Sequence, residues 1–120
     1  MSPEDFDPNC LFCKIIAGQI PADILYKDDR VIAIRDINPQ APTHLLIMPR
    51  EHIPSLAHVR PEQKELIGHL IRVAHELAGR EGLADRGYRV AVNYGRDGGQ
   101  LVPHLHFHLL GGRELSGVMG

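Results

Sequence analysis

Three histidines occupy alternate positions near the end of the chain, in the segment HLHFHLLGG that spans residues 104–112. Strict alternation of polar and apolar residues is typical of a β-strand with one buried face, because successive side chains point to opposite faces. At a rise of about 3.3 Å per residue, we expect the three imidazoles in a row, about 6.6 Å apart. The glycine pair is predicted to end the strand. The histidines are His104, His106 and His108, and the residues expected to face the core are Leu105, Phe107 and Leu109.

This histidine row indicates either metal binding or chemistry. Histidine is both the usual acid, base or nucleophile near neutral pH and the commonest metal ligand. A strand face that is merely solvated more often carries Lys, Thr or Glu, so an exposed row of histidines without a function is the weaker interpretation. The pattern alone leaves metal binding and catalysis both open.

Composition limits the classes of protein that this chain can belong to. Its 120 residues, 43% of them hydrophobic, predict one domain over residues 1–120 with an ordinary core. A net charge of -2 and only 5% aromatic residues argue against a nucleic-acid surface. The acidic start, MSPEDFDPN, lacks the features of a secretion signal, and no apolar run approaches the ~18 residues that span a membrane. We therefore expect a cytoplasmic protein without membrane contact, with a flexible segment at residues 1–9.

Periodicity predicts an α+β fold, with a mostly antiparallel five-stranded sheet, one long helix and a short N-terminal helix. Strands are expected at residues 24–26, 31–37, 43–50, 88–94 and 104–110, and the short helix is expected to end at Gly18. Pro61 is expected to open the long helix, and Gly79 and Gly82 to stop it. The apolar residues predicted to pack this helix on the sheet are Leu66, Ile67, Leu70, Ile71, Ala74, Leu77 and Ala78.

Cys10 and Cys13 form a CxxC motif, which in a cytosolic protein is either a redox pair or half of a metal site. The residues before Cys10 are polar and include a proline, unlike the core strand that precedes a thioredoxin-like motif. A zinc site needs two further ligands, because structural sites are tetrahedral, and the eight histidines supply candidates. Two buried thiols without a metal remain the third possibility.

Two further features have both a structural and a functional interpretation. The loop NYGRDGGQ, residues 93–100, can expose backbone amides to an anion or can form an ordinary hairpin turn. Asp36 can accept hydrogen bonds from a diol such as a ribose or can cap the loop that follows it. His44 is expected to be a hydrogen-bonded residue on the inner face of the sheet.

The histidine row fits nucleophilic catalysis at phosphorus. A neutral imidazole is a good nucleophile, and a covalent intermediate divides one difficult displacement into two easier steps. The attacking ring needs one neighbour that fixes its tautomer and another that protonates the leaving atom. His106, in the centre, has a histidine on each side. The sequence therefore predicts an anionic phosphoryl or nucleotidyl substrate.

The motif His-φ-His-φ-His-φ-φ, filled by residues 104–110, resembles the histidine triad (HIT) family of nucleotide hydrolases and transferases. The segments FCKIIAGQIPA, DINPQAPTH, PREHI, GGQ and HLLGGR are similar to the Hint branch, the nucleoside phosphoramidases. The resemblance implies a HIT-like fold, a homodimer and hydrolysis of purine nucleoside 5′-phosphoramidates through a nucleotidyl-histidine. The alternatives are a dinucleoside polyphosphate hydrolase and a zinc-stabilised nucleotide-binding module with vestigial catalysis.

The resemblance also implies roles for individual residues. His106 is the expected nucleophile, His108 contacts the phosphate and leaving group, and His44 supports them. Asp36 binds the ribose and Asn93 the phosphate. The other residues expected to bind substrate are Gly99, Gln100, Leu101, Leu11, Phe12, Ile15, Ile37 and Leu46, and the expected Zn²⁺ ligands are Cys10, Cys13, His52 and His104.

The chain departs from the Hint pattern at two places. Leu101 stands where Hint proteins carry a serine that contacts phosphate, so that hydroxyl is lost. The tail ELSGVMG lacks the Trp and Pro-Pro ending of the animal proteins. The resemblance implies that backbone amides alone contact the phosphate at Leu101, and that the tail, which approaches the site, bears on the choice of leaving group.

Overall fold

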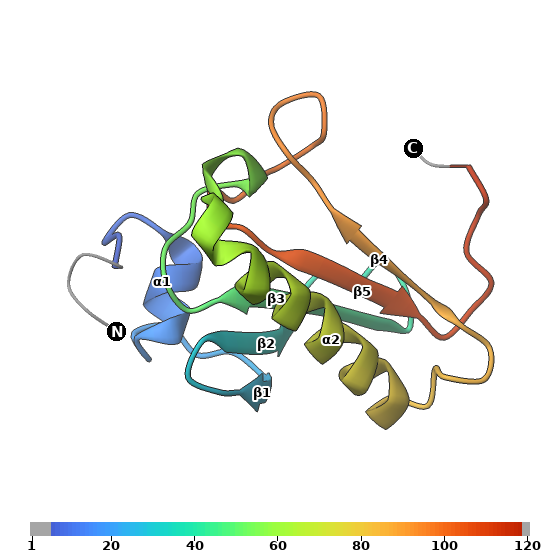
Figure 1. Cartoon of the computed structure of the whole chain (residues 1–120). Helices are drawn as coiled ribbons and strands as arrows, with labels where there is room; N and C mark the ends of the chain where they lie inside the picture. Colours follow the sequence, from blue (N-terminus) through green and yellow to red (C-terminus); the bar gives the residue numbers. More distant parts are fainter. Residues whose placement is uncertain (1–5, 119–120) are drawn as a thin grey trace.

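The computed structural model describes residues 6–118, which form one five-stranded antiparallel sheet with the strand order β1-β2-β3-β5-β4 (Figure 1). This confirms the predicted α+β fold. The strands are β1 (Ile24–Lys27), β2 (Val31–Arg35), β3 (Thr43–Pro49), β4 (Tyr88–Val92) and β5 (Phe107–Gly111). The α-helices are α1 (Leu11–Ile16) and α2 (Lys64–Arg80), and two 3₁₀ turns, η2 (Leu56–His58) and η3 (Pro61–Gln63), lie between β3 and α2.

The two helices cover opposite faces of the sheet. Alternate residues of β3, Leu45 and Ile47, join the core beneath α2, whereas Leu46 and Met48 pack with α1. Figure 1 shows α2 lying across its face of the sheet. Because all seven residues of β3 are buried, this strand is covered on both faces, as its nearly continuous apolar sequence requires.

The long helix differs from its prediction in three details. Pro61 opens the 3₁₀ turn η3, which runs directly into α2. The helix continues through Gly79 to Arg80, and Gly82, with φ of 76°, takes the left-handed position beyond the C-cap. Ile71 is 48% exposed, because it lies at the margin of the stripe that faces the sheet. The buried residues of the helix are Leu66, Leu70, Val73, Ala74, Leu77 and Ala78.

The expected strand of three histidines is shorter than its sequence pattern. β5 begins only at Phe107, so His104 and His106 lie in the irregular segment before it. The backbone N–H of Leu105 donates to the carbonyl of Ile53 instead of to a neighbouring strand, at 2.7 Å. The apolar positions still face the core as predicted, but the single row of imidazoles is wrong because His104 contacts the cysteine sulfurs.

The N-terminal segment is described only in part. Residues 1–5, which belong to the stretch expected to be flexible, lie outside the described residues. In the described part, Asp7 accepts from the backbone N–H of Asn9 at 2.9 Å, and Phe6 packs against the core beneath α1. Within residues 6–118, no helix is long and apolar enough to cross a membrane.

Candidate active site

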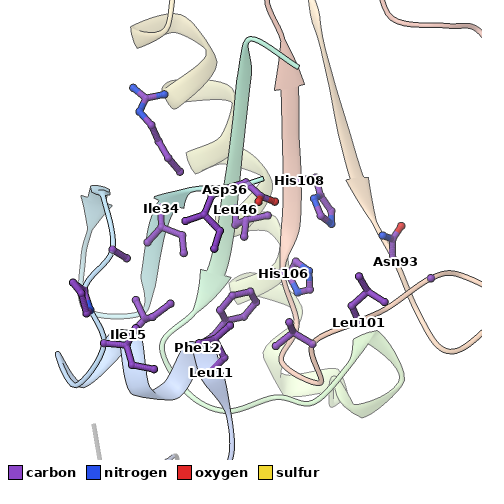
Figure 2. Close-up of a pocket in the computed structure, with 17 residues that line it drawn as sticks. Leu11, Phe12, Ile15, Ile34, Asp36, Leu46, Asn93, Leu101, His106 and His108 are labelled. Carbon is purple, nitrogen blue, oxygen red and sulfur yellow. The ribbon is translucent and has the colours of Figure 1, made fainter. Parts of the chain in front are cut away.

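A cavity of about 300 Å³ opens beside α1, and residues from α1, β2, β3, β5 and the glycine-rich loop line it. Its walls are mostly apolar, and its polar groups gather on one side (Figure 2). A cavity with apolar walls and a few convergent polar groups is typical of a small-molecule site. The apolar wall includes Leu11, Phe12, Ile15, Ile34 and Leu46, and the polar groups include Asp36, Asn93, His106 and His108.

His106 is held in the tautomer that a nucleophile needs. Its Nδ1 lies 2.7 Å from the carbonyl oxygen of His104, and because a carbonyl only accepts, Nδ1 carries the proton. The lone pair is then on Nε2. Phe12 packs edge-on against the ring, with centroids 5.1 Å apart. Burial lowers the pKa of His106 below its usual range, so the ring is neutral and nucleophilic at pH 7.

A hydrogen-bonded chain sets the tautomer of His108. The backbone N–H of Gln40 donates to Nδ1 of His44 at 3.0 Å, so the proton of a neutral His44 is on Nε2. That Nε2 lies 2.9 Å from Nδ1 of His108, which therefore accepts, and the proton of His108 is on its own Nε2. The chain presents an N–H donor on His108 at the edge of the cavity.

The Nε2 of His108 is the one buried side-chain nitrogen or oxygen without a hydrogen-bond partner among the described residues. Burial, followed by the nearby His106 and His44 rings, lowers the pKa of His108 to about 4, so the ring is neutral at pH 7. An unpaired buried donor is costly unless something pairs with it. Its position beside the nucleophile makes a phosphate oxygen or a leaving atom a suitable acceptor.

Asp36 caps the loop that follows it, which is one of the two roles that the sequence left open, and its side chain also lines the cavity. Its Oδ1 accepts from the backbone N–H of Asn38 at 2.9 Å, which forms the predicted cap. Strand β2 ends at Arg35, the residue before this cap. Oδ2 of Asp36 lies 3.4 Å from Nε2 of His44. The nearby carboxylate raises the pKa of His44, but burial lowers it by more, so His44 is neutral.

Four residues predicted to bind zinc meet beside this cavity, with their ligand atoms all within 4.8 Å of one another. Nδ1 of His104 lies 3.3 Å from Sγ of Cys10 and 3.7 Å from Sγ of Cys13, and Nδ1 of His52 lies 3.3 Å from Sγ of Cys13 and from Nδ1 of His104. Tetrahedral zinc with ordinary bond lengths separates a sulfur from a nitrogen by about 3.6 Å and two nitrogens by about 3.3 Å. The four residues therefore fit a zinc ion.

The surroundings of these four residues also suit a metal. Nε2 of His104 donates to the carbonyl of Pro49 at 2.9 Å, which leaves Nδ1 free of a proton and able to coordinate. Nε2 of His52 lies 3.6 Å from a carboxylate oxygen of Asp7. Burial lowers the pKa of His104 to about 4, and burial raises the pKa of the Cys13 thiol to about 11, so thiolate formation here needs a positive charge such as a metal.

The glycine-rich loop is a hydrogen-bonded turn. The amide of Gly99 donates to the carbonyl of Arg96 at 3.2 Å, and the amide of Gln100 to the carbonyl of Gly95 at 3.0 Å. The side chain of Gln100 donates to the carbonyl of Pro54 at 2.8 Å and accepts from the amide of Gly95. These amides donate to carbonyl and side-chain oxygens within the turn, so they are not available to an anion. The side chain of Gln100 stabilises the turn and does not line the cavity.

The remaining predicted residues line the cavity, although two of them lie at its rim. Ile37 is 98% exposed and Leu101 is 92% exposed. Figure 2 places Leu101 and Asn93 on one side of His106 and the residues of α1 on the other. Sequence reasoning missed Ile34, which lies two residues before Asp36, so that alternation along the chain places both side chains on the same face. It also missed the segment Ile20–Ala22, for which the sequence carries no local signal.

The five-stranded sheet with its two helices, and the imidazoles grouped at one cavity, define a class of small α+β proteins. A model of the HIT domain matches residues 17–115, and the chain belongs to the HIT family. This confirms the resemblance drawn from the histidine motif.

Relatives and solved structures agree with this membership. The chain is 50% identical to purine nucleoside phosphoramidase of Escherichia coli K12 over 109 residues, 91% of this chain and 92% of that one. A HIT family hydrolase from Legionella pneumophila superposes with a TM-score of 0.91 at 48% identity, over 93% of this chain and 100% of that one. A histidine triad protein from Clostridium difficile has a TM-score of 0.91 at 41% identity, over 93% and 97% of the two chains.

Proposed function

We propose that this protein hydrolyses purine nucleoside 5′-phosphoramidates to a nucleoside monophosphate and an amine, through a nucleotidyl intermediate on His106. The observation that carries the proposal is the hydrogen bond from Nδ1 of His106 to the carbonyl of His104, which leaves the Nε2 lone pair free beside the cavity. The relative from Escherichia coli, at 50% identity, supports the purine phosphoramidate as the substrate class.

The cavity suits a nucleotide in a definite order. The apolar wall formed by residues such as Phe12 and Leu46 accommodates the base, and Asp36 at the end of β2 accepts from the ribose hydroxyls. The phosphate then lies between Asn93, His106 and His108. Burying the flat base against apolar side chains supplies binding energy. The polar side chains around the ribose and phosphate fix the orientation of the phosphorus.

The reaction proceeds in two displacements. Nε2 of His106 attacks phosphorus, the P–N bond to the amine breaks, and the amine nitrogen takes up a proton through Nε2 of His108. A water then attacks the nucleotidyl-His106 from the opposite side. Its hydroxyl stays on phosphorus and its proton returns to His108, so one water is consumed for each amine and each monophosphate released.

Intact-mass spectrometry tests this proposal. Protein mixed briefly with an adenosine phosphoramidate, and quenched rapidly without acid, is expected to gain the mass of AMP, whereas His106→Ala gains none and releases no amine. Amine release that persists in His106→Ala would falsify the nucleotidyl-histidine route. Faster turnover of a dinucleoside polyphosphate, or nucleotide binding without any turnover, would favour the two alternative functions.

A structural zinc ion is part of the proposal. Cys10, Cys13, His52 and His104 would hold it, and the ion would supply the positive charge that keeps both sulfurs as thiolates. His104 then has two functions, because its ring binds the metal while its carbonyl accepts from His106. The four ligands come from α1 and its N-cap residue, the loop after β3 and the segment before β5, so the ion would stabilise one side of the cavity.

We also propose a homodimer in the cytoplasm, with α2 and an edge strand at the interface. β4 lies at an edge of the sheet and α2 exposes Ile71, which supports this interface. Light scattering is expected to give twice the chain mass of 13.4 kDa, and a mass of one chain contradicts the dimer. A reducing cytoplasm keeps the cysteines available to zinc. With a net charge of -2, neither nucleic acid nor a membrane is proposed as a partner.

A further inference from the structure

Asp7 contacts three of the four residues that are expected to bind zinc. Its carbonyl accepts from the backbone N–H of Cys10 at 3.0 Å, and its backbone also hydrogen-bonds to the thiol of Cys13. One carboxylate oxygen, Oδ2, lies 3.6 Å from Nε2 of His52. Because the two cysteines lie at the start of α1 and His52 follows β3, Asp7 joins parts of the site that are far apart in the sequence.

The two carboxylate oxygens of Asp7 have different partners. Oδ1 accepts from the backbone N–H of Asn9 at 2.9 Å, which closes a local turn of a kind that aspartate and asparagine both form. This turn leads into α1, while Oδ2 lies near His52. The two contacts can be separated, because an asparagine in place of Asp7 keeps the acceptor for the turn but carries an NH₂ group instead of Oδ2.

A carboxylate at this position suits a histidine that binds a metal. Nδ1 of His52 lies 3.3 Å from Sγ of Cys13, so a neutral ring that coordinates through Nδ1 carries its proton on Nε2. Metal-binding histidines almost always donate this second N–H to a carboxylate, a backbone carbonyl or water. The carbonyl of Pro49 is that acceptor for His104. For His52 the corresponding group is the carboxylate of Asp7, whose side chain is 41% exposed and reaches a charge-assisted hydrogen bond of about 2.8 Å by a small rotation.

We propose that Asp7 is a positioning residue of the zinc site, and that its carboxylate orients His52 and raises the affinity of the four ligands for zinc. This inference rests on the proposed zinc site and adds a residue outside the four ligands. A carboxylate that accepts the Nε2–H makes the imidazole a stronger donor at Nδ1 and fixes the plane of the ring. The side chain of His52 is 15% exposed, whereas His104 is fully buried, so the orientation of His52 depends more on this partner.

The test measures zinc binding directly. Each purified protein is loaded with zinc and titrated with a chelator of known affinity, which gives the dissociation constant for zinc. In Asp7→Asn this constant is expected to rise about tenfold, the lower end of the range for lost partners of metal-binding histidines. Thermal unfolding in excess chelator is expected to match that of the unmodified protein, because asparagine keeps the hydrogen bond to Asn9.

A second background shows whether Asp7 acts through His52. His52→Cys replaces the imidazole by another zinc ligand, one that has no N–H to donate to a carboxylate. In this background Asp7→Asn is expected to leave the dissociation constant unchanged to within about twofold, because no second N–H remains for the carboxylate to hold. The matched control, Asp85→Asn, removes the same charge from an exposed residue between α2 and β4 and is expected to leave zinc binding unchanged.

The outcomes separate this inference from the functions on which it rests. Zinc binding as tight in Asp7→Asn as in the unmodified protein overturns the positioning function of Asp7 and leaves the zinc site standing. An equal loss of affinity with and without His52→Cys shows an effect of charge alone and also overturns it. An unmodified protein that binds no zinc contradicts the zinc site itself. Amine release from an adenosine phosphoramidate, measured on the same samples, tests the phosphoramidase function separately.

Discussion

Replacing His44 by leucine tests whether the chain of hydrogen bonds from Gln40 to His108 contributes to catalysis. His44 is 6% exposed and lies between the backbone of Gln40 and the ring of His108. His44→Leu keeps an apolar side chain of similar bulk but removes the donor to Nδ1 of His108. The proton of His108 can then move to Nδ1, so Nε2 no longer presents an N–H to the substrate.

The size of the effect follows from the bond that is lost. Leaving a buried polar group unpaired costs roughly 1–3 kcal/mol. If that cost falls on the transition state, and each 1.36 kcal/mol is tenfold in rate, kcat falls by roughly 5- to 150-fold. KM should change little, because His44 touches His108 and not the base or ribose. His44→Gln, which places an amide N–H near the position of Nε2, should retain more activity than His44→Leu.

Steady-state amine release from an adenosine phosphoramidate gives kcat and KM for each variant. The matched control is His75→Leu, which removes a histidine bonded to the hydroxyl of Tyr88. Thermal unfolding of every variant shows whether the protein is folded. An unchanged kcat in folded His44→Leu, or an equal loss in His75→Leu, refutes the idea that the tautomer of His108 matters.

Three further predictions concern stability, metal and ribose. Burial lowers the pKa of His104 and His108 to about 4 from an ordinary value of 6.5, so the unfolded metal-free chain binds more protons between these values. The free energy of unfolding should therefore be highest above pH 6.5 and should fall as the pH drops towards 4, and the fall should be shallower in His108→Gln. Urea titrations in the presence of a chelator measure this free energy, and a value that does not change with pH contradicts the prediction. In Cys10→Ser, metal analysis should show the loss of about one zinc per chain. The substitution should lower kcat more than it raises KM, because the carbonyl of His104 accepts the hydrogen bond that orients His106. An unmodified protein that is stable without metal refutes the zinc site. Asp36→Asn, which still caps Asn38, should raise KM about tenfold for a ribonucleoside phosphoramidate and much less for its 2′,3′-dideoxy analogue; equal effects on both exclude the ribose contact.

Local patterns predicted most of the fold, because each depends on neighbours close in the sequence. The alternation of residues 104–110 correctly placed Leu105, Phe107 and Leu109 in the core. The helical period correctly placed most of the buried face of α2, and the proline and glycine signals located its ends to within a few residues. The family motif also predicts His106 as the nucleophile, and the structure shows the hydrogen bond that sets the tautomer of this ring.

Several features of the site could not be read from periodicity. Alternation predicted three imidazoles in one row on a strand, yet His104 belongs to the group with Cys10 and His106 to the cavity. The difference arises because β5 starts at Phe107, while Leu105 bonds to Ile53 from a distant loop. The glycine-rich loop was ambiguous, since its amides could face an anion or close a turn, and only the positions of their acceptors decided it.

The sequence by itself determined the type of each element, the side of each element that is buried and the chemical groups available for metal binding and phosphoryl chemistry. The tertiary structure decided which of these groups meet. Pairing of β3 with β5 brings His44 to His108, and packing of α1 beneath the same strands brings Cys10 to His104 across most of the chain. The physical reason is range: propensity and periodicity act over a few residues, whereas tautomers, ligand sets and shared cavity walls depend on contacts that form only when the sheet is assembled.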